Sequence, residues 1–266
     1  MESEALAQAM GEVAMMERDK RIAVLIDADN VSDKYIKYII DEISNHGIPT
    51  YKRIYGDWTK PQLSSWKNVL LNYSITPIQQ YSYTTGKNAT DAALIIDAMD
   101  ILYSNNVDGF CLVSSDSDFT KLAARLREAG MYVIGMGEKK TPTPFISACE
   151  KFKYLEVLAS MSNKPAEVKN IKETHSSEEP KASVAKIDSK LIAAIKTIIT
   201  EISDEDGWAF LGKLGNTLNK RYPDFDTRNY GFTKLTPFLS SLNQFEIRST
   251  KTSNPSISLK YIRNKE

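Results

Sequence analysis

Cysteine and histidine are scarce in this sequence. Its 266 residues include two of each, Cys111 and Cys149, and His46 and His175. They do not show the short spacings that hold a structural zinc ion, such as two cysteines separated by two residues. The sequence therefore argues against a zinc site and against a disulfide framework. We expect both cysteines to be small core residues of a cytoplasmic protein kept in a reducing environment.

An excess of charge and a long apolar run are also missing. Lysine and arginine together number 34, as do aspartate and glutamate. Overall charge therefore points to no nucleic-acid or membrane partner, and such a site must come from local clusters. Apolar stretches fall short of the roughly 20 residues that a membrane-spanning helix needs, so we expect no membrane partner. Residues 1–20 carry early glutamates and no basic segment, and we interpret them as an N-terminal extension rather than a signal peptide.

From residue 21 to residue 159, apolar strands alternate with amphipathic helices. This alternation predicts an α/β domain with a parallel sheet covered by helices on both faces, in which ligands bind beyond the carboxyl ends of the strands. Pro77 marks the third strand as irregular or as an edge of the sheet. The predicted strands are 21–30, 48–56, 75–83, 109–115 and 131–137, the helices are 32–47, 60–73, 88–105, 118–130 and 143–152, and 153–158 is expected to be extended.

The composition changes after this domain. Residues 160–186 are rich in serine, lysine and glutamate and hold almost no large apolar residue, which predicts a flexible linker. Residues 187–266 then show helical patterns followed by two short strands, which predict a small winged-helix-like domain. This last segment has 12 basic and 9 acidic residues, so its positive charge is slight.

Acidic residues gather where two predicted strands end and where one helix begins. Because carboxyl ends of parallel strands meet at one edge of a sheet, we expect these acids to lie near one another. The acids are Asp27 and Asp29 after the first strand, with Asn30 beside them; Asp91 at the start of the helix 88–105; and Asp116 and Asp118 after the strand 109–115.

Two interpretations of these acids are open. Unpaired carboxylates at one place repel each other, and a divalent cation such as Mg²⁺ or Mn²⁺ removes that repulsion. Alternatively, each acid caps a helix, since Ser115 and Asp118 have the spacing of a capping box. The three segments taken together favour the metal site. Asp97 lies about 240° around the helix from Asp91, so we expect it to contact the backbone or solvent instead.

Three segments resemble the NYN domain of the LabA-like group, a branch of the PIN-like nucleases: "RIAVLIDADN", "GKNATDAALIIDAMD" and "CLVSSDSDFTKLAARLREAGMYVIGMG". The resemblance covers residues 21–158. It implies a PIN-like Rossmannoid fold and a metal-dependent ribonuclease that uses Mg²⁺ or Mn²⁺. The residues implied as catalytic and as metal ligands are Asp27, Asp91, Asp116 and Asp118, with Asn30, Asp29, Ser115 and Lys87 in support.

Residues 207–247, "GWAFLGKLGNTLNKRYPDFDTRNYGFTKLTPFLSSLNQFEI", resemble the LOTUS (OST-HTH) domain. This implies a winged-helix-like module that binds RNA, with a protein partner as the alternative, because some members bind a helicase. We expect Gly231 to permit a tight helix start or close packing.

Several side chains are candidates for RNA contact. Basic residues of the C-terminal domain could touch phosphates, or they could form a solvated face. Trp58 and Lys60 could belong to a nucleic-acid groove in the first domain, with Trp58 stacking on a base. The basic candidates are Lys220, Arg221, Arg228 and Lys234, whereas Trp66, Trp208, Phe210, Tyr222 and Phe238 are expected to be core residues.

The leading hypothesis is a metal-dependent ribonuclease with a C-terminal RNA-binding adaptor. One alternative is a haloacid-dehalogenase-like phosphatase, because "VLIDADNV" also resembles the opening motif of that family, with Asp27 as nucleophile and Asp29 as general acid. The later motifs of that family fit badly, since its final acids are adjacent or four apart. The other alternative is a non-catalytic RNA-binding regulator.

Overall fold

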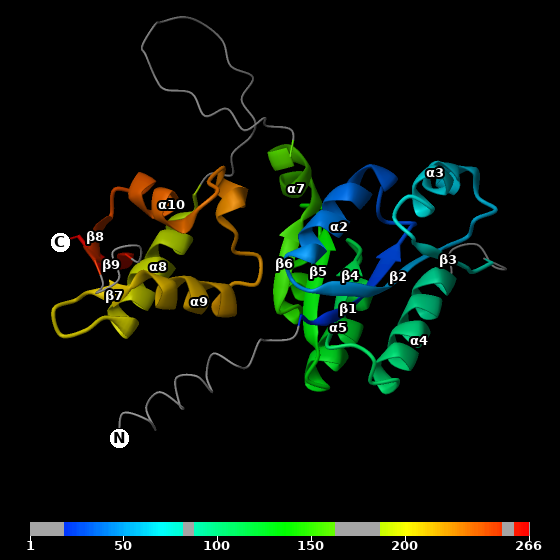
Figure 1. Ribbon diagram of the computed structural model, residues 1–266, viewed down its shortest axis with the longest axis horizontal. Helices are drawn as coiled ribbons and strands as arrows, with labels where there is room; N and C mark the ends of the chain where they lie inside the picture. The colour runs from blue at the N-terminus through cyan, green and yellow to red at the C-terminus, as the bar shows by residue number, and fades with distance from the viewer. Residues whose placement is uncertain (1–18, 82–87, 163–186, 252–257, 266) are drawn as a thin grey trace, which may run out of the picture. The chain divides into compact units, whose positions relative to one another are not determined.

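The computed structural model describes residues 19–81, 88–162, 187–251 and 258–265 (Figure 1). Lys87 and most of the predicted extension and linker lie outside these ranges. No helix in the described ranges is both long and apolar enough to cross a membrane. The chain divides into two compact units, one reaching Ser114 and including Arg125–Val133, the other made of Ser115–Ala124 and the chain from Ile134 onward.

Six parallel strands form one sheet in the order β3-β2-β1-β4-β5-β6, which confirms the predicted fold class. The direction of winding reverses between β1 and β4, and α/β sheets bind their ligands beyond the carboxyl ends of the strands at such a reversal. Pro77 lies in β3 at one edge, as predicted. The strands are β1 (Arg21–Asp27), β2 (Ile48–Gly56), β3 (Thr76–Gln79), β4 (Gly109–Val113), β5 (Tyr132–Gly137) and β6 (Lys151–Tyr154).

β1 is the central strand of the first unit. It pairs with β2 on one side and β4 on the other, and every residue from Ile22 to Asp27 is buried. A run of apolar residues without polar alternation is typical of a strand covered on both faces. Figure 1 shows α2 (Ile36–Ser44) and α3 (Lys67–Leu70) on one side of the sheet and α4 (Ala89–Tyr103) on the other.

Three predicted elements differ from the structure. The helix expected at 143–152 ends at Ala148, and Lys151 and Phe152 belong to β6 instead. The single helix expected at 60–73 is a 3-10 helix, η2 (Pro61–Trp66), followed by the four-residue α3. Leu63 and Trp66 are its buried residues, and their spacing of three matches the three-residue turn of a 3-10 helix. Residues expected to be extended after Tyr154 form the helix α7 (Leu155–Ser162), because a short apolar run does not distinguish helix from strand. The other elements of this region are η1 (Asp33–Tyr35), η3 (Ser117–Phe119), α5 (Thr120–Glu128) and α6 (Thr143–Ala148).

Asp97 joins α4 to β2. Its carboxylate accepts hydrogen bonds from the Arg53 guanidinium and from the Tyr55 hydroxyl, so the expectation of a backbone or solvent contact was wrong. Burial and the charge of Asp97 raise the pKa of Tyr55 well above its ordinary value, and the phenol therefore stays protonated as a donor. Asp97 thus belongs to the packing of α4 on the sheet.

The C-terminal residues form helices against a small antiparallel sheet, with strand order β7-β9-β8. A core of isoleucine, leucine and phenylalanine lies between them. Gly231 follows η4 with a φ of 80°, so it ends a helix in the left-handed conformation rather than starting one. The elements are α8 (Ser189–Ile202), β7 (Ala209–Phe210), α9 (Leu211–Arg221), η4 (Thr227–Tyr230), α10 (Leu235–Ser241), β8 (Phe245–Lys251) and β9 (Ser258–Asn264).

Within the second unit, the segment before η4 contacts the edge strand β6. The Phe152 amide donates to the Pro223 carbonyl at 2.8 Å, and Lys153 forms an ion pair with Asp226 at 2.5 Å. Both side chains of the ion pair are 13% exposed. Removing one partner of such a nearly buried pair is expected to be costly, because it leaves the other charge without compensation.

The aromatic residues of the C-terminal domain divide into two groups. Phe238 is fully buried and contacts Phe225, Tyr230 and Phe232, as predicted for a core residue. Phe210 and Tyr222 are instead 42% and 37% exposed, so the prediction that they belong to the core was wrong. Trp66 of the first domain is 2% exposed and is a core residue, as predicted.

This division predicts that substitution by alanine reduces stability by different amounts at Phe238 and Phe210. Phe238→Ala leaves a cavity in the C-terminal core and is expected to reduce stability by about 3–5 kcal/mol. Phe210→Ala, with an exposed ring, is expected to cost less than about 1 kcal/mol. Native-state hydrogen exchange of the amides in α8 and α9 of the full chain measures both effects, and equal loss of protection in the two variants would contradict the assignment.

Candidate metal centre

Asp27 is the last residue of β1 and its side chain is fully buried. Its carboxylate accepts from the Asn30 amide nitrogen at 2.7 Å and the Ser114 hydroxyl at 2.8 Å, both through Oδ2, and from the Asp29 backbone nitrogen at 3.0 Å. Burial raises the pKa of Asp27 above its ordinary value, although these hydrogen bonds act in the opposite direction. A positive charge nearby would favour its ionised form.

Three other acids form a compact group. One carboxylate oxygen from each of Asp91, Asp116 and Asp118 lies within 4.8 Å of the others. Oxygens that bind one Mg²⁺ at about 2.1 Å are at most about 4.2 Å apart, so small side-chain adjustments would suffice for all three to bind one ion. Asp91 and Asp116 are half-buried and Asp118 is exposed. All the donors are hard oxygens, which suits Mg²⁺ or Mn²⁺ rather than a softer metal.

The local backbone explains why Asp116 is well placed. Asp116 is the N-cap of η3, and its Oδ1 accepts from the Asp118 backbone nitrogen at 3.0 Å. The capping box expected from Ser115 and Asp118 was therefore wrong, because the cap is Asp116. The Ser115 hydroxyl instead accepts from the Glu138 backbone nitrogen at 2.9 Å, tying the loop to the end of β5. Cap and candidate ligand are the same side chain.

The structure does not gather all the predicted ligands. Asp91, Asp116 and Asp118 come together, whereas Asp27 belongs to the hydrogen-bonded cluster with Asn30 and lies outside that group. Asp29 pairs with Lys60 at 3.3 Å.

Two residues at the carboxyl ends of the strands were missed by the sequence predictions. Ser114 is 1% exposed and donates to Asp27. Asp57, directly after β2, is 7% exposed, and its Oδ1 accepts from the Thr59 hydroxyl at 2.6 Å and the Gln79 amide at 3.1 Å. An acid that directly follows a strand was the available signal for Asp57, as it was for Asp27.

A cleft of about 320 Å³ opens beside the carboxyl end of β1. Its lining consists of residues 28–33 and, from η2, of Gln62, Leu63, Ser65 and Trp66. Asn30 therefore contacts Asp27 and also faces this cleft. Trp58, the residue predicted to stack on a base, is half-buried. Its indole nitrogen donates to the Ile78 carbonyl at 3.1 Å, and this hydrogen bond restrains the orientation of the ring.

The basic residues predicted to touch RNA differ in their partners. Arg221 pairs with Glu201 at 2.5 Å, and Arg228 pairs with Asp226 at 2.7 Å. Asp226 also caps η4 by accepting from the Arg228 backbone nitrogen. Lys220 and Lys234 are exposed. The two lysines are thus better placed for a phosphate than the two arginines.

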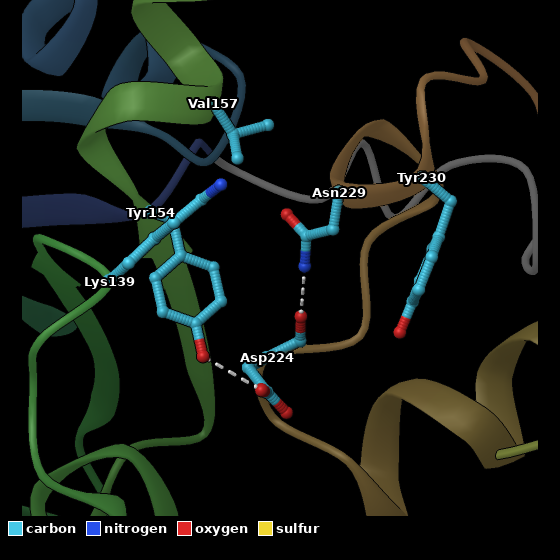
Figure 2. Close-up of a pocket in the computed structure, with 6 residues that line it drawn as sticks. All are labelled: Lys139, Tyr154, Val157, Asp224, Asn229 and Tyr230. Carbon is cyan, nitrogen blue, oxygen red and sulfur yellow. Dashed lines mark hydrogen bonds between the residues drawn. The ribbon is translucent and has the colours of Figure 1, made fainter. Parts of the chain in front are cut away.

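The second unit holds another pocket, of about 270 Å³ (Figure 2). The Tyr154 hydroxyl donates to the Asp224 carboxylate at 2.9 Å, and the Asn229 amide donates to the Asp224 carbonyl at 2.8 Å. Burial and the charge of Asp224 raise the pKa of Tyr154. Lys139, Val157 and Tyr230 complete the lining, which includes none of the acids predicted for the metal site.

Two solved structures resemble parts of this chain. A crystal structure of a protein of unknown function from Vibrio parahaemolyticus is 18% identical, with a TM-score of 0.44, over 53% of this chain and 95% of that one. A solution structure of an uncharacterized protein from Nitrosomonas europaea is 29% identical, with a TM-score of 0.28, over 36% of this chain and 93% of that one. A search of curated proteins found no match.

Family comparisons assign both halves of the chain. Residues 182–257 match the OST-HTH/LOTUS domain, and the described part of this range holds α8, α9 and α10 together with β7 and β8. Residues 21–156 match the NYN domain, and this region holds the six-stranded sheet and the acidic group. This match spans more than half of the chain, and the protein therefore belongs to the NYN domain family.

Proposed function

We propose that the protein is a metal-dependent ribonuclease that hydrolyses phosphodiester bonds of RNA. The observation that carries this proposal is the group formed by Asp91, Asp116 and Asp118, whose oxygens approach within 4.8 Å. A cationic group that offsets their negative charge would stabilise three carboxylates at this separation. The NYN family, a group of PIN-like nucleases, supplies the expectation that the compensating group is a metal.

Asp91, Asp116 and Asp118 would hold the ion, and Asp27 would add negative charge to the same edge of the sheet. Bound Mg²⁺ or Mn²⁺ would lower the pKa of a water and offset charge on a phosphodiester. The chain's own contribution is positional. The cap hydrogen bond holds the Asp116 carboxylate in one orientation, and Ser114 and Asn30 hold that of Asp27.

The C-terminal domain would act as an adaptor for RNA. Its exposed Lys220 and Lys234 would contact phosphates, and these contacts would add affinity without sequence preference. The alternative is that this domain binds a protein partner, since the LOTUS resemblance is compatible with RNA binding and with protein binding.

The phosphatase hypothesis is less well supported. It needs Asp27 as a nucleophile that reaches a substrate phosphorus, but this side chain is fully buried and accepts three hydrogen bonds. It also needs Asp29 as a general acid, and Asp29 pairs with Lys60.

Asp116→Asn is expected to lower the rate of RNA cleavage by on the order of 100-fold or more, because it removes one negative charge from the ligand group. Asparagine is as good an N-cap as aspartate, so the loop should keep its fold. The measurement is cleavage of labelled single-stranded RNA in Mn²⁺, in Mg²⁺ and in EDTA.

The matched control is Asp100→Asn, which removes the same charge from an exposed position on α4 outside the group. It should cleave RNA like the wild type. A phosphate monoester in parallel reactions tests the phosphatase alternative. Binding of RNA without cleavage in any metal would point to the non-catalytic regulator, and hydrolysis of the monoester alone would point to the phosphatase.

Metal binding can be detected without any substrate. A ligand that binds only the folded state stabilises it by RT ln(1 + [L]/Kd), which is about 2.7 kcal/mol at one hundred times Kd. Mn²⁺ is therefore expected to raise the thermal midpoint of the wild type and of Asp100→Asn. The rise should be small or absent in Asp118→Asn, as measured by differential scanning fluorimetry. Equal rises in all three proteins would place the metal elsewhere.

A further inference from the structure

The three-stranded sheet of the C-terminal domain has a core face and an outer face. Ala209 and Ile262 pair across β7 and β9, and both are fully buried. The neighbouring pair in the register consists of Phe210 and Tyr261, and Tyr261 in turn pairs with Arg248 of β8. Because successive side chains of a strand point to opposite faces, this second row lies on the outer face of the sheet.

Cations and rings meet on this outer face. The Arg248 guanidinium lies 4.1 Å from the ring centroid of Trp208 and 5.4 Å from that of Tyr261. The Arg263 guanidinium lies 4.8 Å from the Trp208 ring, and the rings of Phe210 and Tyr261 are 5.9 Å apart. We call this set of five side chains the aromatic–arginine surface.

The rings of this surface are not part of the domain core. The buried residues of the core and the partly buried ones packed against it include neither Trp208, Phe210 nor Tyr261. A Cβ added at Gly212 would lie 2.7 Å from the Phe210 ring. That ring therefore rests on the backbone of α9 while Phe210 remains 42% exposed. Folding of the domain therefore gains less from this ring than from the fully buried ring of Phe238.

The charges of the surface are unequally compensated. Arg263 pairs with Glu246 at 2.5 Å, and both side chains are 43% exposed. Arg248 is exposed and, in the part of the chain that the structure describes, has ring contacts but no carboxylate within ion-pair distance. A guanidinium that lies over aromatic rings can still offer donors to a phosphate or a base edge.

We propose that the aromatic–arginine surface binds single-stranded RNA by stacking bases on Phe210 and Tyr261 while Arg248 contacts the backbone. Aromatic rings and arginines on an exposed sheet are the combination that tolerates any base, since every base has a face that stacks. This proposal rests on the proposed function, because it names the surface through which the ribonuclease would hold its substrate. It assigns binding to the sheet as well as to the lysines Lys220 and Lys234.

Binding is tested in the full chain carrying Asp116→Asn, so that a fluorescent RNA probe stays intact. Phe210→Leu and Arg248→Gln are each expected to weaken binding of an unstructured single strand by roughly tenfold in fluorescence anisotropy. Arg248→Gln should also lower the slope of log K against log salt concentration by about one. The matched control is Tyr222→Leu, which removes an exposed aromatic ring outside the surface and should bind like the parent. Circular dichroism checks that each variant is folded.

Unchanged binding by both Phe210→Leu and Arg248→Gln would overturn the proposal and leave the surface to a protein partner. Equal weakening by Tyr222→Leu would also overturn it, since the effect would not be specific to this surface. A third result would overturn it as well: duplex RNA that binds as tightly as the single strand and is weakened equally by the two substitutions. Paired bases cannot stack on the rings, so such binding would not depend on stacking. The proposed function is tested separately: in a chain with intact acids, Phe210→Leu should raise KM for RNA and leave kcat unchanged. Weakened binding without cleavage by any variant would support the surface while rejecting the nuclease.

Discussion

A carboxylate removed from water must receive hydrogen bonds, and the junction between β1 and β4 is arranged around this requirement at Asp27. Two donors come from the turn after β1, through the backbone of Asp29 and the side chain of Asn30. The third comes from Ser114, directly after β4. These bonds join the two strand ends at which the sheet reverses its winding. The chain then reaches Asp116 two residues after Ser114, so the requirement at Asp27 also fixes where the acidic group begins.

The sequence was informative wherever burial dictates residue type. A strand covered on both faces must be apolar throughout, so β1 and β4 and the acids after them were directly predictable. The choice between adjacent serines was not. Neighbouring residues of an extended chain point in opposite directions, and only the pairing of β4 with β1 decides that Ser114 reaches Asp27 while Ser115 reaches Glu138. For the same reason the cap was assigned to Ser115 although Asp116 provides it.

The C-terminal domain shows a second limit of the same kind. Aromatic residues occur both in cores and on exposed sheets, so residue type alone does not decide between the two. A shift of one residue in the register of β7 against β9 would exchange Ala209 and Phe210 between the two faces. Partners distant in the sequence likewise decide what a basic residue can do. Arg221 donates a hydrogen bond to Glu201, twenty residues earlier in the sequence. No local sequence pattern predicts that pairing.

The two edge strands of the six-stranded sheet have a consequence for how copies of the chain meet. An exposed edge offers unpaired backbone groups to a strand of another molecule, which leads to association and aggregation. β3 spans only four residues and includes Pro77, which has no amide hydrogen to offer. At the other edge, Phe152 of β6 already donates to Pro223. Both edges are thereby poor templates, and intermolecular growth of the sheet is discouraged by a proline on one side and by the chain's own later residues on the other.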